Sequence, residues 1–97
     1  MKIKYYAQTS EWSGGPEEDL TITGDSGDGV PVRQILSRLA SRHGDLFKMK
    51  IYNPASDLLQ EDIFLLLNGR HLARLSGMDT RVQENDVLAV IPVTEAG

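Results

Sequence analysis

The sequence contains no cysteine among its 97 residues. This absence excludes disulfide scaffolds, cysteine-ligated zinc sites, iron–sulfur clusters and thiol nucleophiles. Only two histidines are present, His43 and His71, and they are too few to build a metal site without cysteines. We therefore expect no bound metal, and any chemistry must depend on other groups.

The sequence also lacks a long hydrophobic run. Its longest, residues 63–67, is far shorter than the roughly 20 apolar residues that span a bilayer. The first residues, Met1 and Lys2 among them, lead straight into a charged, alternating segment without the apolar core of a signal peptide. We therefore expect a soluble, cytoplasmic protein.

Basic residues are in the minority, with ten Lys and Arg against fourteen Asp and Glu and a net charge of −4. A chain of this sign is poorly suited to phosphate backbones or anionic lipid, so we expect neither nucleic acid nor membrane as a partner. A partner attracted by the overall charge should present a basic face.

The length and the ordinary share of apolar residues indicate one globular domain. Alternating and β-branched segments, bounded by turn residues, predict strands at residues 2–7, 19–23, 63–67, 71–72 and 87–91. Turns are predicted at residues 10–18, 53–56 and 84–86, a loop at 24–29, and a tight hairpin at Asn68 and Gly69. The last strand is apolar on both faces and should be central, with Pro92 at its end.

One helix is predicted, beginning at Pro31 and ending at a left-handed Gly44. Its apolar stripe comprises Val32, Ile35, Leu36, Leu39 and Ala40. The order of elements predicts an α+β roll with a mixed sheet of four to five strands packed on this main helix. The domain should span residues 1–93, with a mobile C-terminal tail at residues 94–97.

The sequence supports neither a phosphate- or calcium-binding loop nor a serine nucleophile. The glycine-rich loop at residues 24–29 carries Asp25 and Asp28, which would repel a phosphate, and its spacing does not match a calcium loop. No serine lies in a nucleophile-elbow context. Nothing in the sequence indicates an active site that works alone.

Strand alternation sends Phe64 and Leu66 to the sheet face opposite Ile63 and Leu65. If the helix covers only one face, Phe64, Leu66 and Ile91 form an apolar surface for a partner. The alternative is that the long connection at residues 44–61 folds over this face. The pattern alone favours neither.

Two segments together resemble the ubiquitin-like β-grasp sulfur carriers of the MoaD/ThiS family, which includes the small subunit of molybdopterin synthase and the thiamine-pathway sulfur carrier. One is Ile-Phe-Leu-Leu-Leu-Asn-Gly at residues 63–69, and the other is residues 84–93, followed by a tail ending in Gly97. The opening strand and the helix from Pro31 agree with this layout.

The resemblance implies a carrier rather than an enzyme. The carboxylate of Gly97 would be adenylated by a ubiquitin-activating-like adenylyltransferase, which uses the ATP, and then converted to a thiocarboxylate. The tail residues Thr94, Glu95 and Ala96 would enter the partner's active site with Gly97. No cofactor would be bound. A synthase large subunit or another sulfur-accepting enzyme would be a second partner, in molybdenum or tungsten pterin cofactor biosynthesis or in thiamine biosynthesis.

Two other functions remain open at this point. The family ends in Gly-Gly, whereas Ala96 precedes the last glycine here, and its Cβ restricts φ where the tail must thread a channel. The chain would then be a β-grasp interaction module whose tail is not activated. Alternatively, activation of Gly97 would serve to attach the chain to lysines as a ubiquitin-like modifier.

Overall fold

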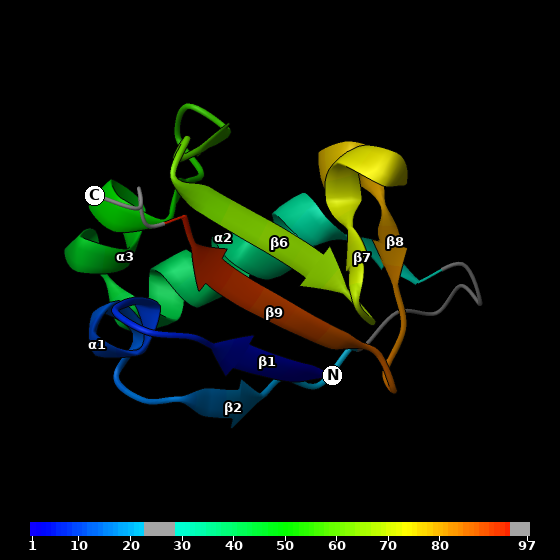
Figure 1. The fold of residues 1–97 in the computed structure, drawn as a ribbon, viewed down its shortest axis with the longest axis horizontal. Helices are drawn as coiled ribbons and strands as arrows, with labels where there is room; N and C mark the ends of the chain where they lie inside the picture. The colour runs from blue at the N-terminus through cyan, green and yellow to red at the C-terminus, as the bar shows by residue number, and fades with distance from the viewer. Residues whose placement is uncertain (23–28, 94–97) are drawn as a thin grey trace.

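The main sheet of the computed structural model has five strands in the order β2-β1-β9-β6-β7 (Figure 1). The structure describes residues 1–22 and 29–93. The strands are β1 (Lys2–Tyr5), β2 (Glu17–Asp19), β6 (Ile63–Leu67), β7 (Arg70–His71) and β9 (Val87–Pro92). β9 is central, parallel to β1 and antiparallel to β6, and Pro92 is its last residue. The predicted mixed sheet and central last strand are confirmed.

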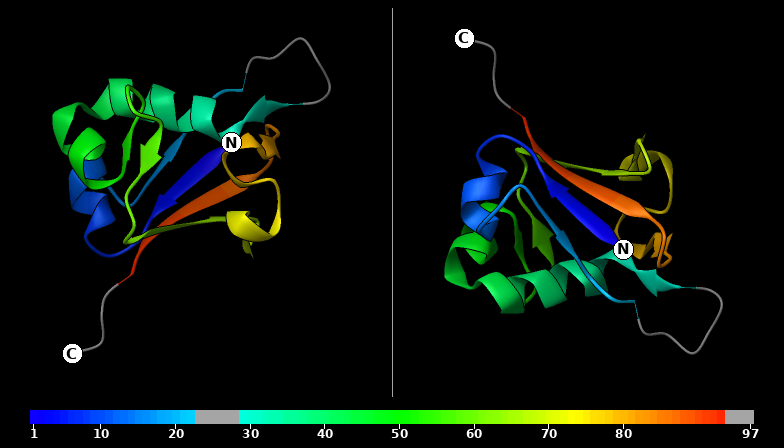
Figure 2. Two further views of the ribbon diagram at one scale, coloured as in Figure 1. Left: turned by 90° about the horizontal axis from the view of Figure 1, so that it is seen from above. Right: turned by 90° about the horizontal axis from the view of Figure 1, so that it is seen from below.

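Helix α2 (Val32–His43) covers one face of this sheet, which the views from above and below make clear (Figure 2). The five residues of the predicted apolar stripe are all buried. Pro31 precedes the first helical residue, where its missing N–H costs nothing. Gly44 has the predicted positive φ of 89°, but its ψ of −153° is not left-handed helical, because a second helix begins at the next residue.

Two short α-helices, α1 and α3, are not predicted from the sequence. The segment predicted as a turn at residues 10–18 begins with α1 (Thr9–Ser13), and only at Gly14, with φ 85°, does the chain turn. A helix this short is unstable alone, so tertiary contacts hold it. The Thr9 hydroxyl donates to the Tyr6 carbonyl at 2.6 Å and lies 3.2 Å from the carbonyl of Val90.

The connection at residues 44–61 contains α3 (Asp45–Lys50) and a small hairpin of β4 (Tyr52–Asn53) and β5 (Leu58–Leu59), with the predicted turn between its strands. Phe47 and Ile51 are fully buried on the side of α2. The alternative that this connection covers the other face of the sheet is wrong, because Phe64 on that face remains 43% exposed.

The remaining short elements close the end of the sheet near β7. They are β3 (Val30–Pro31) paired with β8 (Arg81–Val82), and the 3-10 helices η1 (Leu72–Arg74) and η2 (Gly77–Asp79). Asn68 and Gly69 both have positive φ, as the predicted hairpin requires. The first two predicted strands also pair, but they comprise residues 2–5 and 17–19. Most of the predicted acidic loop at 24–29 lies outside the described residues.

Candidate functional site

The last described residue, Val93, marks where the chain leaves the sheet. Its N–H donates to the carbonyl of Asp62 at 2.6 Å, which ties the end of β9 to the start of β6. On the other side of β9, the Tyr6 N–H donates to the Val90 carbonyl at 3.0 Å. The exit of the chain is therefore held from both neighbouring strands. The predicted tail, Thr94, Glu95, Ala96 and Gly97, and its predicted mobility lie outside the described residues.

The sheet face opposite α2, here called the open face, is covered by no helix in the part of the chain that the structure describes (Figures 1 and 2). Alternation and register give it Lys2 and Lys4 of β1, Phe64 and Leu66 of β6, and Val87, Ala89 and Ile91 of β9. Phe64 lies directly opposite Ile91, and Leu66 opposite Ala89. Leu66 and Ile91 are half-buried. The predicted clustering of Phe64, Leu66 and Ile91 on one face is confirmed.

The ring of His71 extends the apolar surface of the open face. It lies edge-on to Phe64 with 5.0 Å between the ring centres, and its Nδ1 accepts a hydrogen bond from the N–H of Ala73. The other side of the face is charged, with Lys2 3.9 Å from the carboxylate of Glu17. The open face thus has an apolar half on β6 and β9 and a charged half on β1 and β2.

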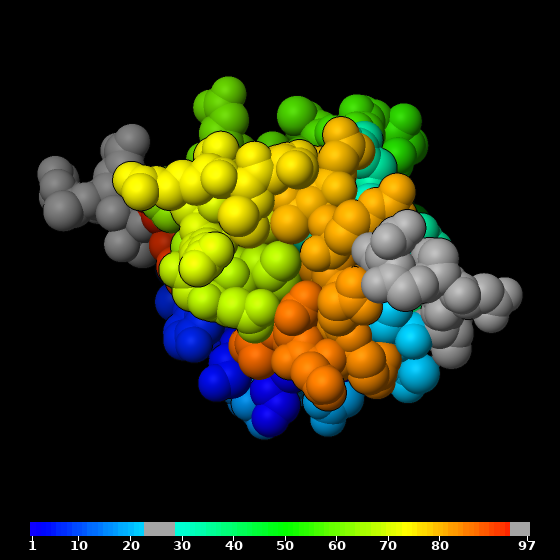
Figure 3. All heavy atoms as spheres, turned by 90° about the vertical axis from the view of Figure 1, so that its right-hand side faces the viewer, coloured from blue at the N-terminus to red at the C-terminus, as the bar shows by residue number. Residues whose placement is uncertain are grey.

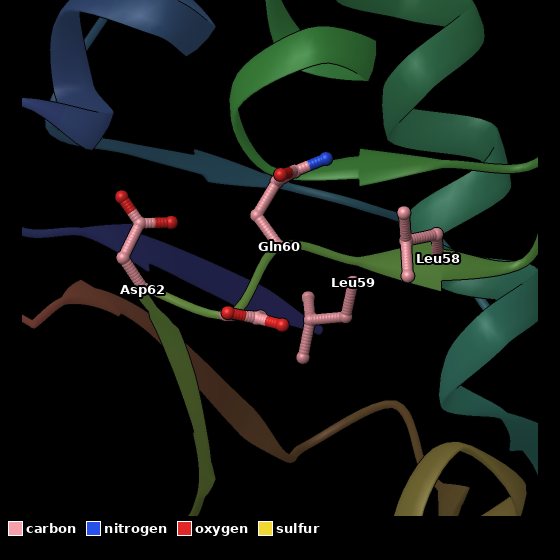
Figure 4. A pocket seen from close by; sticks show the side chains of 5 residues that line it. Leu58, Leu59, Gln60 and Asp62 are labelled. Carbon is pink, nitrogen blue, oxygen red and sulfur yellow. The ribbon is translucent and has the colours of Figure 1, made fainter.

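A hollow of about 370 Å³ adjoins the exit of the chain (Figure 4). It is lined by the segment that joins β5 to β6, namely Leu58, Leu59, Gln60, Glu61 and Asp62. Leu58 is 53% exposed, so the hollow presents an apolar side chain and two carboxylates, and its residue Asp62 contacts Val93 through the backbone. No pattern in the sequence predicts a role for this segment.

A second hollow, of about 520 Å³, lies at the opposite end of β6. It is lined by Leu66, Gly69, Arg70, His71, Arg74 and Leu75. The hairpin that positions Arg70 is predicted from the sequence, but the hollow is not. No sequence pattern marks it, because Arg74 and Leu75 reach it from the 3-10 turn η1.

A polar cluster beneath β2 fixes the sheet to α2. The carboxylate of Glu18 accepts hydrogen bonds from Tyr5 at 2.6 Å and Arg42 at 2.7 Å, and it lies 2.5 Å from Nε2 of His43. Burial opposes the ionisation of Glu18, but these hydrogen bonds together outweigh it and lower the pKa of Glu18. Burial, and then the bond to Glu18, raises the pKa of Tyr5.

His43 belongs to the same cluster. It is the last residue of α2, and its ring stacks on Phe47 with 5.7 Å between centres. The cluster thus holds α2 against the sheet. Among residues 1–22 and 29–93, no three His, Asp or Glu side chains gather as a metal site, and no helix is long and apolar enough to cross a membrane.

Comparison with known proteins supports the resemblance seen in the sequence. Residues 3–95 match the family model described as the ThiS family. No curated protein matches the sequence. Among solved structures, the chain is similar to small archaeal modifier protein 1 from Methanosarcina acetivorans, with 24% identity and a TM-score of 0.74 over 99% of this chain and 94% of that one.

Two further structures are similar over nearly the whole chain. One is a putative molybdopterin converting factor, subunit 1, from Pyrococcus furiosus, with 25% identity and a TM-score of 0.67 over 96% of this chain and 95% of that one. The other is a chain in the BexX/CysO complex of Amycolatopsis orientalis, with 18% identity and a TM-score of 0.73 over 99% of this chain and 98% of that one. These likenesses confirm the predicted ubiquitin-like β-grasp fold.

Proposed function

Because this chain belongs to the ThiS family, we propose that it is a sulfur carrier activated at the carboxylate of Gly97. The observation that carries the proposal is the family match over residues 3–95. A ubiquitin-activating-like adenylyltransferase supplies the activation and uses the ATP. The chain itself is a carrier and not an enzyme, and it needs no bound cofactor.

The chemistry has two steps. The Gly97 carboxylate attacks the α-phosphorus of ATP, so that an acyl adenylate forms and pyrophosphate leaves. A sulfur donor at the level of hydrosulfide then attacks the acyl carbon, AMP leaves, and one proton is released with the thiocarboxylate. Glycine suits this step because the absence of a Cβ lets the chain end pass through a narrow channel.

The length of the tail limits how the partner must dock. Under the proposal that Gly97 bears the reacting carboxylate, the stretch from Val93 to Gly97 spans four residues, which at about 3.5 Å each reach no more than about 14 Å. The reacting phosphorus must therefore lie within that distance of Val93. A partner that brings its active site so close must cover the surface around Val93, which includes the apolar half of the open face.

Phe64, Leu66 and Ile91 are the residues that we assign to this docking. Phe64 is large, aromatic and exposed, and aromatic side chains are enriched among the residues that dominate binding energy in interfaces. Ile91 lies directly across the strand pair from Phe64 and two residues before Val93. The docking surface and the exit of the tail are therefore contiguous.

Intact-mass spectrometry tests the proposal. The purified protein, whose mass also verifies that Gly97 is its last residue, is incubated with the adenylyltransferase encoded in the same genome, ATP and sulfide. We expect a species whose mass has changed by the exchange of one oxygen for sulfur, and none from a variant that lacks Gly97. A mass that stays unchanged while the same enzyme activates its other carriers would refute activation.

Ala96 favours a second candidate function, an interaction module whose tail is not activated. Its Cβ narrows the φ range of the tail at the step before the terminal glycine. A stable complex with the partner, combined with an unreactive Gly97, would identify this function. A modifier would differ again, because activation would be followed by adducts joined to lysines through isopeptide bonds, visible as heavier bands on a blot of cell extract.

The acceptor of the sulfur is the last element of the proposal. We propose biosynthesis of a molybdenum or tungsten pterin cofactor, or of thiamine, with a synthase large subunit or another sulfur-accepting enzyme as second partner. The likeness to the molybdopterin converting factor subunit from Pyrococcus furiosus supports the pterin alternative. Transfer of sulfur from the loaded carrier to each candidate acceptor, followed by product analysis, discriminates between them.

A further inference from the structure

The second hollow, lined by Leu66, Arg70, His71, Arg74 and Leu75 together with Gly69, contains the two arginines of this chain that have no partner among the described residues. The other arginines are engaged: Arg33 with Asp57 and Asp79, Arg38 with the carbonyl of Thr21, Arg42 with Glu18, and Arg81 with the carbonyl of Gly29. Both unpartnered guanidinium groups therefore belong to exposed residues at one hollow.

The backbone that carries these two arginines is held in place. Arg70 pairs with Leu67 across a two-residue turn, and Leu72, which begins η1, is buried. His71 caps the first turn of η1 by accepting from the N–H of Ala73 at 3.0 Å. Arg74 is the last residue of η1, so the same cap also fixes the position of its backbone. The hollow is therefore built on ordered backbone.

The hollow also has an apolar side that connects it to the open face. Leu75 is 38% exposed, and Leu66 belongs both to the hollow and to the open face. Figure 3 shows this end of the molecule, where the yellow residues around 70–75 adjoin the yellow-green residues of the β6–β7 hairpin. The hollow is thus a continuation of the docking surface and not a separate patch.

The residues that line the hollow indicate which class of ligand it binds. Guanidinium groups pair with carboxylates through two parallel hydrogen bonds, and exposed leucines favour an apolar neighbour. The net charge of −4 disfavours a nucleic acid or an anionic membrane. We propose that this hollow docks an acidic segment of the adenylyltransferase, one that carries carboxylates beside an apolar side chain. The identity of the partner rests on the proposed function.

The position of the hollow gives this contact a purpose. Along β6, Ile63 adjoins the exit of the chain and Leu67 adjoins the hollow, and four steps of about 3.3 Å separate them by about 13 Å. A partner held at both ends of β6 cannot rotate on the open face. The contact at the hollow thereby aligns the tail with the partner's active site.

Charge reversal tests the proposal. In the double variant Arg70→Glu and Arg74→Glu, binding to the adenylyltransferase is measured by titration calorimetry without ATP, so that the result does not depend on activation. We expect affinity to fall by about tenfold or more. The matched control, Lys48→Glu with Lys50→Glu, changes the net charge equally on α3 and should bind within about twofold of the wild type.

A second readout follows the alignment of the tail. In ATP–pyrophosphate exchange, the arginine variant should raise the carrier concentration for half-maximal rate and also lower the maximal rate, because the bound carrier is no longer held in one orientation. The conservative variant Arg70→Lys with Arg74→Lys should retain part of the affinity, because it keeps the charge and loses the paired hydrogen bonds. Circular dichroism and urea unfolding verify that each variant is folded.

The outcomes distinguish this proposal from the proposed function. Equal affinity of the wild type and the arginine variant, or an equal loss in the lysine control, overturns the docking site and leaves activation of Gly97 untouched. A wild-type chain that binds through Arg70 and Arg74 but forms no adenylate supports the docking site and overturns activation. A wild-type chain that does not bind the adenylyltransferase overturns both.

Discussion

Phe64 and Leu65 are neighbours in β6 whose side chains leave the strand on opposite faces, so truncating each to alanine separates docking from folding. Leu65 is 1% exposed and lies in the core. Leu65→Ala should lower the free energy of unfolding by about 2–4 kcal/mol, through lost transfer energy and the cavity left behind. Phe64 is 43% exposed, so the loss of its buried part should cost only about 1–2 kcal/mol.

The same two changes should have opposite consequences for binding. Phe64→Ala removes the aromatic side chain at the centre of the apolar half, and we expect the affinity for the adenylyltransferase to fall by about tenfold or more, or about 1.4 kcal/mol. Leu65→Ala removes nothing from the open face, so the folded fraction should bind with unchanged affinity. The smaller stability effect thus accompanies the larger binding effect.

The free energies of unfolding of the two variants are measured by urea unfolding, followed by the fluorescence of Trp12, the single tryptophan. With a slope of about 1.5 kcal/mol per molar urea, Leu65→Ala should move the midpoint down by about 2 M. Their affinities for the adenylyltransferase are measured by calorimetric titration without urea. A Phe64→Ala variant that binds as well as the wild type, or that loses as much stability as Leu65→Ala, would refute the assignment of this face to docking.

Three further predictions concern the core, the polar cluster and the tail. Gly29→Ala should lower the free energy of unfolding by about 2–5 kcal/mol, since φ is +77° and a Cβ would lie 2.2 Å from a backbone carbonyl oxygen. The control Gly14→Ala, at φ +85° with open space around it, should cost only about 1–2 kcal/mol. Urea unfolding measures both. Glu18→Gln should cost about 1–3 kcal/mol at neutral pH. Because folding lowers the pKa of Glu18, the stabilisation by this carboxylate is present above the unfolded pKa of about 4.3 and is lost as pH falls through the folded pKa. The free energy of unfolding of Glu18→Gln should therefore fall less steeply at acidic pH than that of the wild type, whereas Glu17→Gln should follow the wild type. Ala96→Gly should raise the rate of pyrophosphate exchange without changing the unfolding midpoint, and a slower exchange would contradict the threading argument.

The parts of the fold that the sequence predicts are those encoded by a repeating pattern. The alternation through β6 places Leu65 inside and Phe64 outside, and the stripe of α2 gives a continuous buried face. The turn at Asn68 and Gly69 is equally local, since both residues must adopt positive φ. Each of these features is fixed by residues within a few positions of one another.

The missed helices α1 and α3 depend on contacts far apart in the chain. They are five and six residues long, too short for a periodic pattern or for independent stability. α1 is held by the contact of the Thr9 hydroxyl with the carbonyl of Val90, 81 positions away, and α3 by burial of Phe47. Nothing in either segment alone distinguishes it from a turn.

The docking hollow could not be predicted for the same reason. That Arg70 and Arg74 lack partners is known only once the folded chain shows where the carboxylates lie, as Asp57 does beside Arg33. From the sequence alone, both side chains are known to be positively charged, but the groups that they contact are not. The open face was easier to predict, because the side of a strand that a residue occupies follows from its position alone.

The two ends of β6 carry charges of opposite sign, and this resolves the apparent conflict between an acidic chain and an acidic partner segment. Glu61 and Asp62 line the hollow beside the exit of the chain, whereas Arg70 and Arg74 line the hollow at the far end. The separation of about 13 Å exceeds the screening length of about 8 Å at physiological ionic strength, so a partner senses each end nearly independently. A partner that is basic near the tail and acidic at the far hollow is attracted at both ends. In the reversed orientation, like charges would meet at both ends, so the charges that favour correct alignment also exclude its opposite.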